Sequence, residues 1–200
     1  MRIPHAVLAV ASLSLLVASC TSDDPPAVAD LGQVVPAAEQ APSGLRYADR
    51  LSGPVDLEAF RGDPQGRDAM GAAGFRSAWT ALFADPALLA FFTLSRPGAQ
   101  PPKQAELLTV TAALFSDAAG ASEALRFFEE EAGATLEHPA TESTATTFRI
   151  AGRRGGEATL SLGGTADEIV VLVRSQGAIS PERVTELFDE TLDGAREEVG

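Results

Sequence analysis

The spacing of apolar side chains in the second half of the chain predicts both strands and helices. Residues 106–115 (ELLTVTAALF) are rich in β-branched and apolar side chains, which is typical of a strand. The segment after them has the helical period, with Asp117 placed to cap its start and Gly133 to end it. The apolar face of this predicted helix consists of Ala121, Leu125, Phe128 and Ala132.

A period of two residues returns farther along the chain. Residues 146–151 and 157–162 alternate apolar and polar positions, which predicts a hairpin around the glycine-rich residues 152–156. Gly163 and Gly164 are expected to turn the chain again. Residues 168–174 contain IVVLV, which is apolar on both faces of a strand, so we place this strand in the centre of the sheet.

The chain is predicted to end in a long amphipathic helix. Ser180, Pro181 and Glu182 give a capping hydroxyl, a proline at the first helical position and an acid in the first turn. The buried stripe is expected to contain Val184, Leu187, Phe188, Thr191, Leu192 and Ala195.

The first half of the folded part is less regular. Residues 56–60 can form one or two helical turns, and residues 65–73 predict a short helix that Gly74 closes. Residues 75–83 fit either period, but the preceding glycine and the aromatic content favour a strand. Residues 88–95 (LLAFFTLS) then predict a second strand, or a short helix if 75–83 is itself helical.

This order of elements predicts an α+β domain over residues 45–200. Strands joined by short turns imply an antiparallel sheet, and we expect the helices to pack on one face of it.

The N-terminus has the pattern of an export signal. After Met1-Arg2, residues 6–18 form an apolar run that only Ser12 and Ser14 interrupt. This run is too short to span a bilayer comfortably, because a spanning helix needs about 20 residues.

The next residues, Val17-Ala18-Ser19-Cys20, resemble the lipobox of bacterial lipoproteins. The resemblance implies cleavage of residues 1–19, a diacylglycerol on the Cys20 sulfur, acylation such as palmitoylation of the new amino terminus, and attachment to the outer face of the cell membrane. Cys20 is the one cysteine in the chain, so an ordinary cleaved signal or an intermolecular disulfide are the alternatives. The succession of a strand, an SDAAGA helix start, a β-meander and a helix also resembles small actinobacterial envelope lipoproteins, a resemblance that implies no activity.

Residues 20–44 are predicted to be a disordered linker. Prolines at 25, 26, 36 and 42 interrupt this alanine-rich segment, and no apolar period persists. The alternative is a docking segment around Leu31 to Val35.

Composition narrows the range of partners. Apolar residues make up 45% of the chain, which is enough for a packed core. The net charge of -13 argues against nucleic acid, because phosphate contacts need clustered Lys and Arg. It also argues against an electrostatic membrane patch, so the membrane is expected to be reached through the lipid anchor.

No set of catalytic residues stands out. His138 is the one histidine left after cleavage, and it lies in the polar segment 136–139, while no G-x-S-x-G elbow nominates a serine. Zinc sites draw on Cys and His, of which too few are present. We therefore predict a protein that is not an enzyme and that uses no cofactor or metal.

Two functional hypotheses remain. In the first, the domain is a binding or accessory module that contacts an envelope protein through its sheet face or through Arg153 and Arg154 at a hairpin tip. In the second, it carries an apolar ligand in a cavity between helices and sheet. That cavity would be lined by Trp79, Phe83, Phe91 and Phe92.

Overall fold

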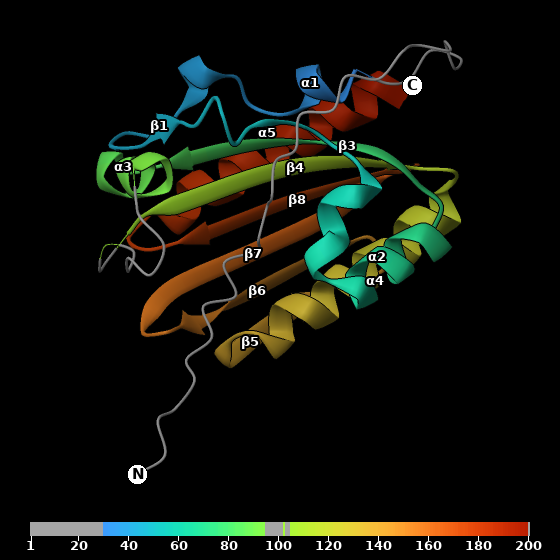
Figure 1. Cartoon of the computed structure of the whole chain (residues 1–200). Coiled ribbons are helices and arrows are strands. Elements are labelled where there is room, and N and C mark those ends of the chain that lie inside the picture. Colours follow the sequence, from blue (N-terminus) through green and yellow to red (C-terminus); the bar gives the residue numbers. More distant parts are fainter. Residues whose placement is uncertain (1–29, 95–101, 103–104, 200) are drawn as a thin grey trace.

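The computed structural model describes residues 30–94, 102 and 105–199 of the chain. These residues form one antiparallel sheet with helices on both sides of it (Figure 1). In chain order the elements are α1 (Leu31–Val34), η1 (Ala38–Gln40), β1 (Arg46–Tyr47), β2 (Gly53–Val55), η2 (Leu57–Gly62), α2 (Pro64–Ala72), β3 (Phe75–Ala84), α3 (Pro86–Leu94), β4 (Leu107–Phe115), α4 (Ala118–Ala134), β5 (Glu137–Ser143), β6 (Thr147–Arg154), β7 (Glu157–Ala166), β8 (Ile169–Gln176) and α5 (Pro181–Val199).

The sheet has the strand order β1-β3-β4-β8-β7-β6-β5, and β2 pairs with β3 beside β1. Strands β5 to β8 form a meander, and α4 carries the chain from β4 to the far edge, where β5 lies. Strand β8 therefore lies between β4 and β7 in the middle of the sheet, which confirms the central position predicted for residues 168–174.

The predicted α+β class and antiparallel sheet are confirmed, but the expectation that all helices pack on one face is wrong. Ile169, Val171 and Val173 of β8 belong to the core under α5. Val170 and Leu172, which alternate with them, belong to the core under α4 and α2. A strand that is apolar on both faces needs cover on both faces, so the helices divide between them.

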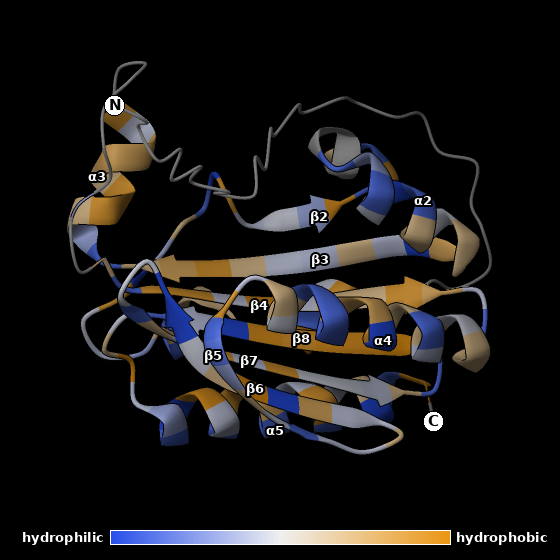
Figure 2. Ribbon diagram, turned by 90° about the horizontal axis from the view of Figure 1, so that it is seen from below, coloured by the Kyte–Doolittle hydropathy of each residue, from blue (hydrophilic) through white to orange (hydrophobic). Residues whose placement is uncertain are grey.

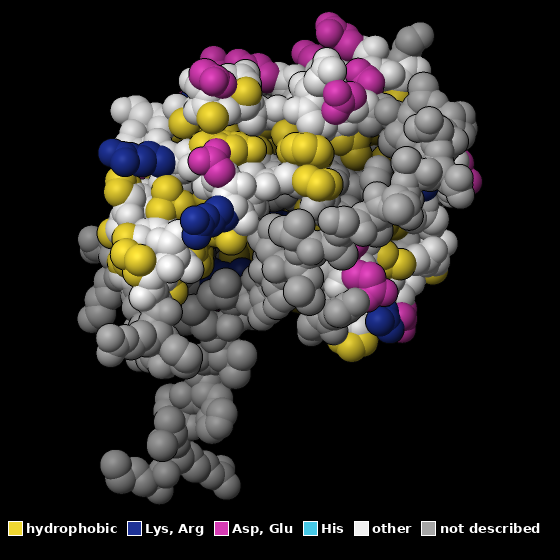
Figure 3. Space-filling model, turned by 45° about the horizontal axis from the view of Figure 1, so that its top comes forward, with side chains coloured by type: hydrophobic (Ala, Val, Ile, Leu, Met, Phe, Trp, Pro, Cys, Tyr) yellow, Lys and Arg dark blue, Asp and Glu magenta, His cyan; other side chains and the backbone are white. Residues whose placement is uncertain are grey.

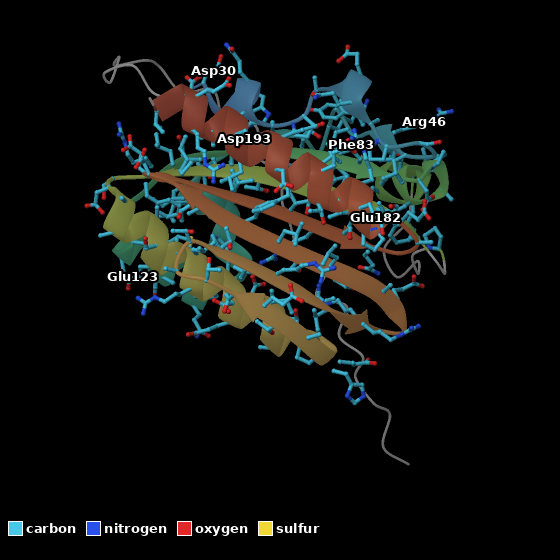
Figure 4. The ribbon with its side chains drawn as sticks, turned by 180° about the vertical axis from the view of Figure 1, so that it is seen from behind. Asp30, Arg46, Phe83, Glu123, Glu182 and Asp193 are labelled. Carbon is cyan, nitrogen blue, oxygen red and sulfur yellow. The ribbon has the colours of Figure 1, made fainter. Side chains whose placement is uncertain are left out.

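Helix α5 closes the larger of the two cores. Its six predicted stripe residues are all buried, and Figure 4 shows the helix lying across the back of the sheet, with Glu182 and Asp193 along it. Phe83 of β3 is fully buried in the same core, where its ring meets Tyr47 of β1 edge-on at a centroid distance of 5.4 Å.

The segment before β1 is part of the fold, so the predicted linker is wrong for residues 30–44. Leu31, Val34 and Val35, which belong to the alternative docking segment, are buried in the protein's own α5-side core. The backbone N–H of Asp30 donates to Glu198 near the end of α5 at 2.9 Å. The predicted signal peptide, the lipobox and Cys20 lie outside the described residues.

Two further expectations about local structure are wrong. Residues 86–94 form helix α3 and not a strand, because Asp85 caps the start of the helix: its Oδ1 accepts from the N–H groups of Ala87 and Leu88. Gly163 and Gly164 do not turn the chain but lie buried within β7. A Cβ at Gly163 would overlap the ring of Phe148, so the glycine makes room for that side chain.

Most other elements agree with the sequence pattern. Residues 75–83 are in a strand, Gly74 ends α2 with φ 74°, and Asp117 caps α4 through the N–H of Gly120 at 2.8 Å. The hairpin of β6 and β7 is also confirmed. Edge strand β5 was not predicted, because every one of its residues is exposed and no apolar period marks it.

Replacing Gly163 with Ala should destabilise the domain by about 1–3 kcal/mol, because Phe148 is buried and cannot swing away from the added methyl group. Gly133→Ala in α4 is the matched control, since its Cβ would come no nearer than 4.0 Å to Ile150. This control should gain up to about 1 kcal/mol from helix propensity. Urea unfolding of both variants measures the difference, and equal stabilities would contradict the packing described for β7.

Candidate functional site

The sheet face on the α4 side has two separate apolar clusters. One lies under α2 and α4 and includes Phe115 and Phe128. The other lies under α3, at the far end of β3, and includes Leu82 and Leu88. Figure 2 shows α4 and α3 at opposite ends of this face. The core under α5, by contrast, is continuous.

Polar side chains fill the sheet between the two clusters. They come from four neighbouring strands, β3, β4, β8 and β7, and we call them the polar stripe. The polar stripe consists of Thr80, Thr109, Thr111, Thr159, Ser161, Arg174 and Gln176.

The strand register makes the polar stripe contiguous. Residues that are paired across neighbouring strands point to the same face of a sheet, so each pair places two polar groups side by side. The pairs within the stripe are Thr80 with Thr111, Thr109 with Arg174, Arg174 with Ser161, and Gln176 with Thr159.

Several groups of the stripe are held by contacts within the protein. The hydroxyl oxygens of Thr80 and Thr111 lie 2.9 Å apart in a hydrogen bond. An Arg174 terminal nitrogen donates to a carboxylate oxygen of Glu131 on α4 at 2.7 Å, and the guanidinium carbon lies 6.0 Å from the ring centroid of Phe128. Helix α4 thus fixes the position of the arginine over the sheet.

Two polar atoms of the stripe are buried without a hydrogen-bond partner: Thr159 Oγ1 and Arg174 Nε. Gln176 faces Thr159 across β7 and β8, and Ser161 faces Arg174, so the two unpartnered atoms belong to diagonal neighbours. A buried polar group with no partner costs about 1–3 kcal/mol. Both atoms are themselves buried, so a molecule in solution would meet the partly exposed groups of the stripe, such as Thr109, Thr111 and Gln176.

The four aromatic residues proposed for an apolar cavity do not come together. Trp79 and Phe83 belong to the α5-side core, and the ring of Trp79 lies against Gly32 of α1. Phe91 and Phe92 are on α3 and pack on the opposite side of the sheet. The prediction that these four residues line one cavity is wrong. Successive side chains of β3 point to opposite faces of the sheet, so Trp79 and Phe83 face away from α3.

The arginine pair at the hairpin tip is also divided. Arg153 and Arg154 are consecutive in β6 and point to opposite faces. The Arg153 side chain donates to the carbonyl oxygen of Gly156, and Arg154 lies opposite Glu157. The two guanidinium groups therefore do not form one cradle for an anion.

The surface has a hollow of about 630 Å³ that runs along α5, next to Arg149 of β6. Acidic side chains line it, and Figure 3 shows acidic groups gathered on the side of the molecule where α5 lies. A second hollow of about 330 Å³ lies between α4 and β5–β6. Neither hollow is lined by the four aromatic residues proposed for a cavity. The lining of the first consists of Arg149, Pro181, Glu182, Thr185, Glu186, Asp189, Glu190 and Asp193.

Candidate catalytic and metal-binding groups stay apart. His138 is exposed on β5 with φ 53°, at an irregularity in the pairing with β6. Among the residues that the structure describes, no group of three His, Cys, Asp or Glu side chains is arranged to hold a metal ion. Over the same ranges, no helix combines the length and the apolar character that a bilayer crossing requires.

Comparison with known proteins adds a likeness in fold. No protein-family model matches the chain, and no curated protein matches it in sequence. The crystal structure of the extracellular domain of PknH from Mycobacterium tuberculosis is similar, with a TM-score of 0.57 and 10% sequence identity. The match covers 86% of this chain and 98% of that chain. The likeness shows the fold alone.

The sequence contains a pattern that could have predicted the polar stripe. Strand β4 has hydroxyl side chains at the alternate positions Thr109 and Thr111, and β7 has them at Thr159 and Ser161. Such alternation marks one polar face within an otherwise apolar strand. That these faces adjoin depends on the strand order, which places β8 between β4 and β7.

Asp85 anchors α3 at the edge of this face. Besides capping α3, its Oδ2 accepts from the N–H of Glu106 at 2.8 Å, which joins α3 to the start of β4. Burial raises the pKa of the Asp85 carboxyl, but backbone hydrogen bonds from Leu88, Glu106 and Ala87 outweigh it, so the pKa lies below its ordinary value.

Because folding lowers the pKa of Asp85, its contribution to stability is present above the unfolded value and is lost as the pH falls through the folded one. Asp85→Asn should destabilise the domain by about 1 kcal/mol at neutral pH, since one carboxylate acceptor is removed. The difference from wild type should shrink as the pH falls below about 5 and through the lowered pKa of Asp85 in the folded protein. Thermal unfolding across this range measures the effect.

The matched control is Asp49→Asn, because Asp49 is exposed on the loop after β1. The prediction fails if the Asp85 and Asp49 variants show the same dependence of stability on pH.

Proposed function

We propose that this protein is a lipid-anchored, extracytoplasmic binding domain without catalytic activity, and that its ligand lies on the polar stripe. The signal region and lipobox support export and anchoring through Cys20. The likeness in fold to an extracellular domain is in keeping with this location.

One observation carries the binding proposal: neighbouring strands bring the partly exposed side chains of Thr109, Thr111, Arg174 and Gln176 together on one face of the sheet. A polar ligand on this face would form hydrogen bonds with these groups in place of water.

The same observation disfavours the carrier of an apolar ligand. An apolar molecule on the stripe would cover its partly exposed polar side chains, among them Thr109, Thr111 and Gln176, without satisfying them. The face also lacks the four converging aromatics on which the carrier hypothesis rested.

Binding can be mapped by methyl NMR on the full chain, purified in a zwitterionic detergent, with isotope-labelled threonine. Titration with a water-soluble extract of bacterial cell envelopes should shift the methyl signals of Thr109, Thr111 and Thr159. The signal of Thr185 should stay in place, because α5 covers the opposite face of the sheet. Shifts confined to Thr185, or none at all, would contradict the proposed site.

Anchoring requires a separate test. Cells fed an alkyne-labelled fatty acid should label the wild-type protein, and Cys20→Ser should abolish the label, because the thiol is the attachment point of the lipid. One acyl chain gives marginal membrane binding while two give a stable anchor. We therefore expect the wild type in the membrane fraction after a high-salt wash. Ser19→Ala, which keeps a small residue before the cysteine, is the control, and equal labelling of the Cys20 variant would refute the anchor.

A further inference from the structure

Helix α3 is apolar on all of its sides. Its sequence is PALLAFFTL, and no charged side chain occurs from Pro86 to Leu94. Figure 2 shows this apolar character along the helix, which stands at one end of the sheet. A helix that is apolar all round is usually covered by protein or by lipid.

The fold covers only one face of α3. Leu88 is buried in the cluster under the helix, but Ala87, Ala90 and Leu94 are exposed on the outer face, at the helical spacing i, i+3, i+7. Leu94 is 79% exposed, and no other large apolar side chain is exposed among the residues that the structure describes. Contiguous apolar surface of this kind marks a site of contact with a partner or a membrane.

The polar groups of α3 are satisfied within the protein. Thr93 has the one polar side chain of the helix, and its hydroxyl shares its proton between the carbonyl oxygens of Leu89 at 3.0 Å and Ala90 at 3.2 Å. At the start of the helix, Asp85 accepts from two backbone N–H groups. An unsatisfied polar group is costly in lipid. The outer face of α3 can therefore leave water without leaving a polar side chain unpaired.

The same contacts favour lipid over a protein as the occupant of this face. Protein interfaces usually contain hydrogen bonds across them. The side chains of the outer face supply none, because the Thr93 hydroxyl is bonded within the helix. The net charge of -13 opposes electrostatic attraction to anionic lipid, so apolar contact is the form of membrane binding that the chain can use.

The distance to the proposed anchor permits this contact. Residues 21–29 lie between Cys20 and the fold, and nine residues span at most about 30 Å. The chain enters the fold at α1, where Gly32 lies against the ring of Trp79 in β3. From Trp79 to the start of α3 at Pro86 the chain can extend about 23 Å. The tether is thus long enough for Cys20 and α3 to reach the same bilayer.

Helix α3 is too short to cross that bilayer. Nine residues make a helix of about 14 Å, while the hydrocarbon core is about 30 Å thick. From these observations we infer that the outer face of α3 inserts into the surface of the bilayer to which Cys20 anchors the chain. This inference rests on the proposed lipid anchor and adds a second contact, which would fix how the domain is oriented on the membrane.

The test uses the full chain with its acylated Cys20, reconstituted into phosphatidylcholine vesicles. Since Cys20 is the one cysteine of the chain, an introduced cysteine is the only free thiol once the lipid is attached. Leu94→Cys takes a fluorescent label on α3, and Glu123→Cys takes it on the exposed surface of α4 as the matched control. Lipids with a nitroxide at a shallow acyl position should quench the label at position 94, because interfacial helices lie about 5–10 Å into the boundary of headgroups and acyl chains. The label at position 123 should keep its emission.

A second set of variants tests the apolar contact itself. With the label attached through Ala90→Cys, the further change Leu94→Glu should abolish the quenching, because a carboxylate resists transfer into lipid. Leu94→Met keeps an apolar side chain and should keep the quenching. Both changes lie at an exposed position, so unfolding in urea should match that of the labelled parent.

The outcomes separate this inference from the anchor on which it rests. If the acylated protein stays in the vesicles but position 94 is not quenched, the contact of α3 is refuted while the anchor stands. Equal quenching at positions 94 and 123, or unchanged quenching with Leu94→Glu, refutes insertion through this face. A blue-shifted emission at position 94 that nitroxide lipid does not quench indicates a protein neighbour, such as a second copy, and refutes lipid as the occupant. If mass spectrometry finds no lipid on Cys20, the anchor and the inference both fail.

Discussion

The architecture depends on the burial of strand β8 from both sides. Its first five residues, Ile169 to Val173, are all buried, and they alternate between the two cores. At about 25 cal/mol per Å² of buried apolar surface, each such side chain is worth about 1.5–3 kcal/mol only if it is covered. One helix layer can cover only one face, so α4 and α5 have to lie on opposite sides. The central place of β8 in the sheet follows from the same need.

The cover on the two faces differs in a way that bears on function. On the α5 side, the long helix and the short α1 segment close one continuous core. On the other side, α4 runs from the end of β4 toward β6, and α3 packs at the far end of β3. Between α4 and α3, the strands present polar side chains on this face in place of apolar ones. These are the hydroxyl groups of the polar stripe, Gln176 and Arg174. This is where the fold brings partly exposed polar side chains together, and it is where we propose that a ligand binds.

The docked N-terminal segment bears on the proposed lipid anchor. Leu31, Val34 and Val35 tie residues 30–44 to the core, so only residues 21–29 separate the domain from Cys20. Nine residues span at most about 30 Å. A domain anchored through Cys20, as we propose, would therefore stay close to the membrane. Segment α1 also packs on the side away from the polar stripe, because it contacts the α5-side core.

The sequence by itself determined the elements whose signals are local. The α5 stripe, the caps at Asp117 and Ser180, and the apolar run of β8 each depend on neighbours within a few residues, and each was read correctly. The sequence did not determine residues 86–94, because their apolar run fits both the helical and the strand period. The cap at Asp85, seen in the structure, decides for the helix. The glycines of β7 were misread because their role depends on Phe148 in the neighbouring strand. Only the tertiary structure could bring Thr80, Thr109, Thr159 and Arg174 onto one face, because strand order and register are set by contacts far apart in the chain. The polar stripe is a property of that order, while the fold class and the final helix are properties of the pattern along the chain.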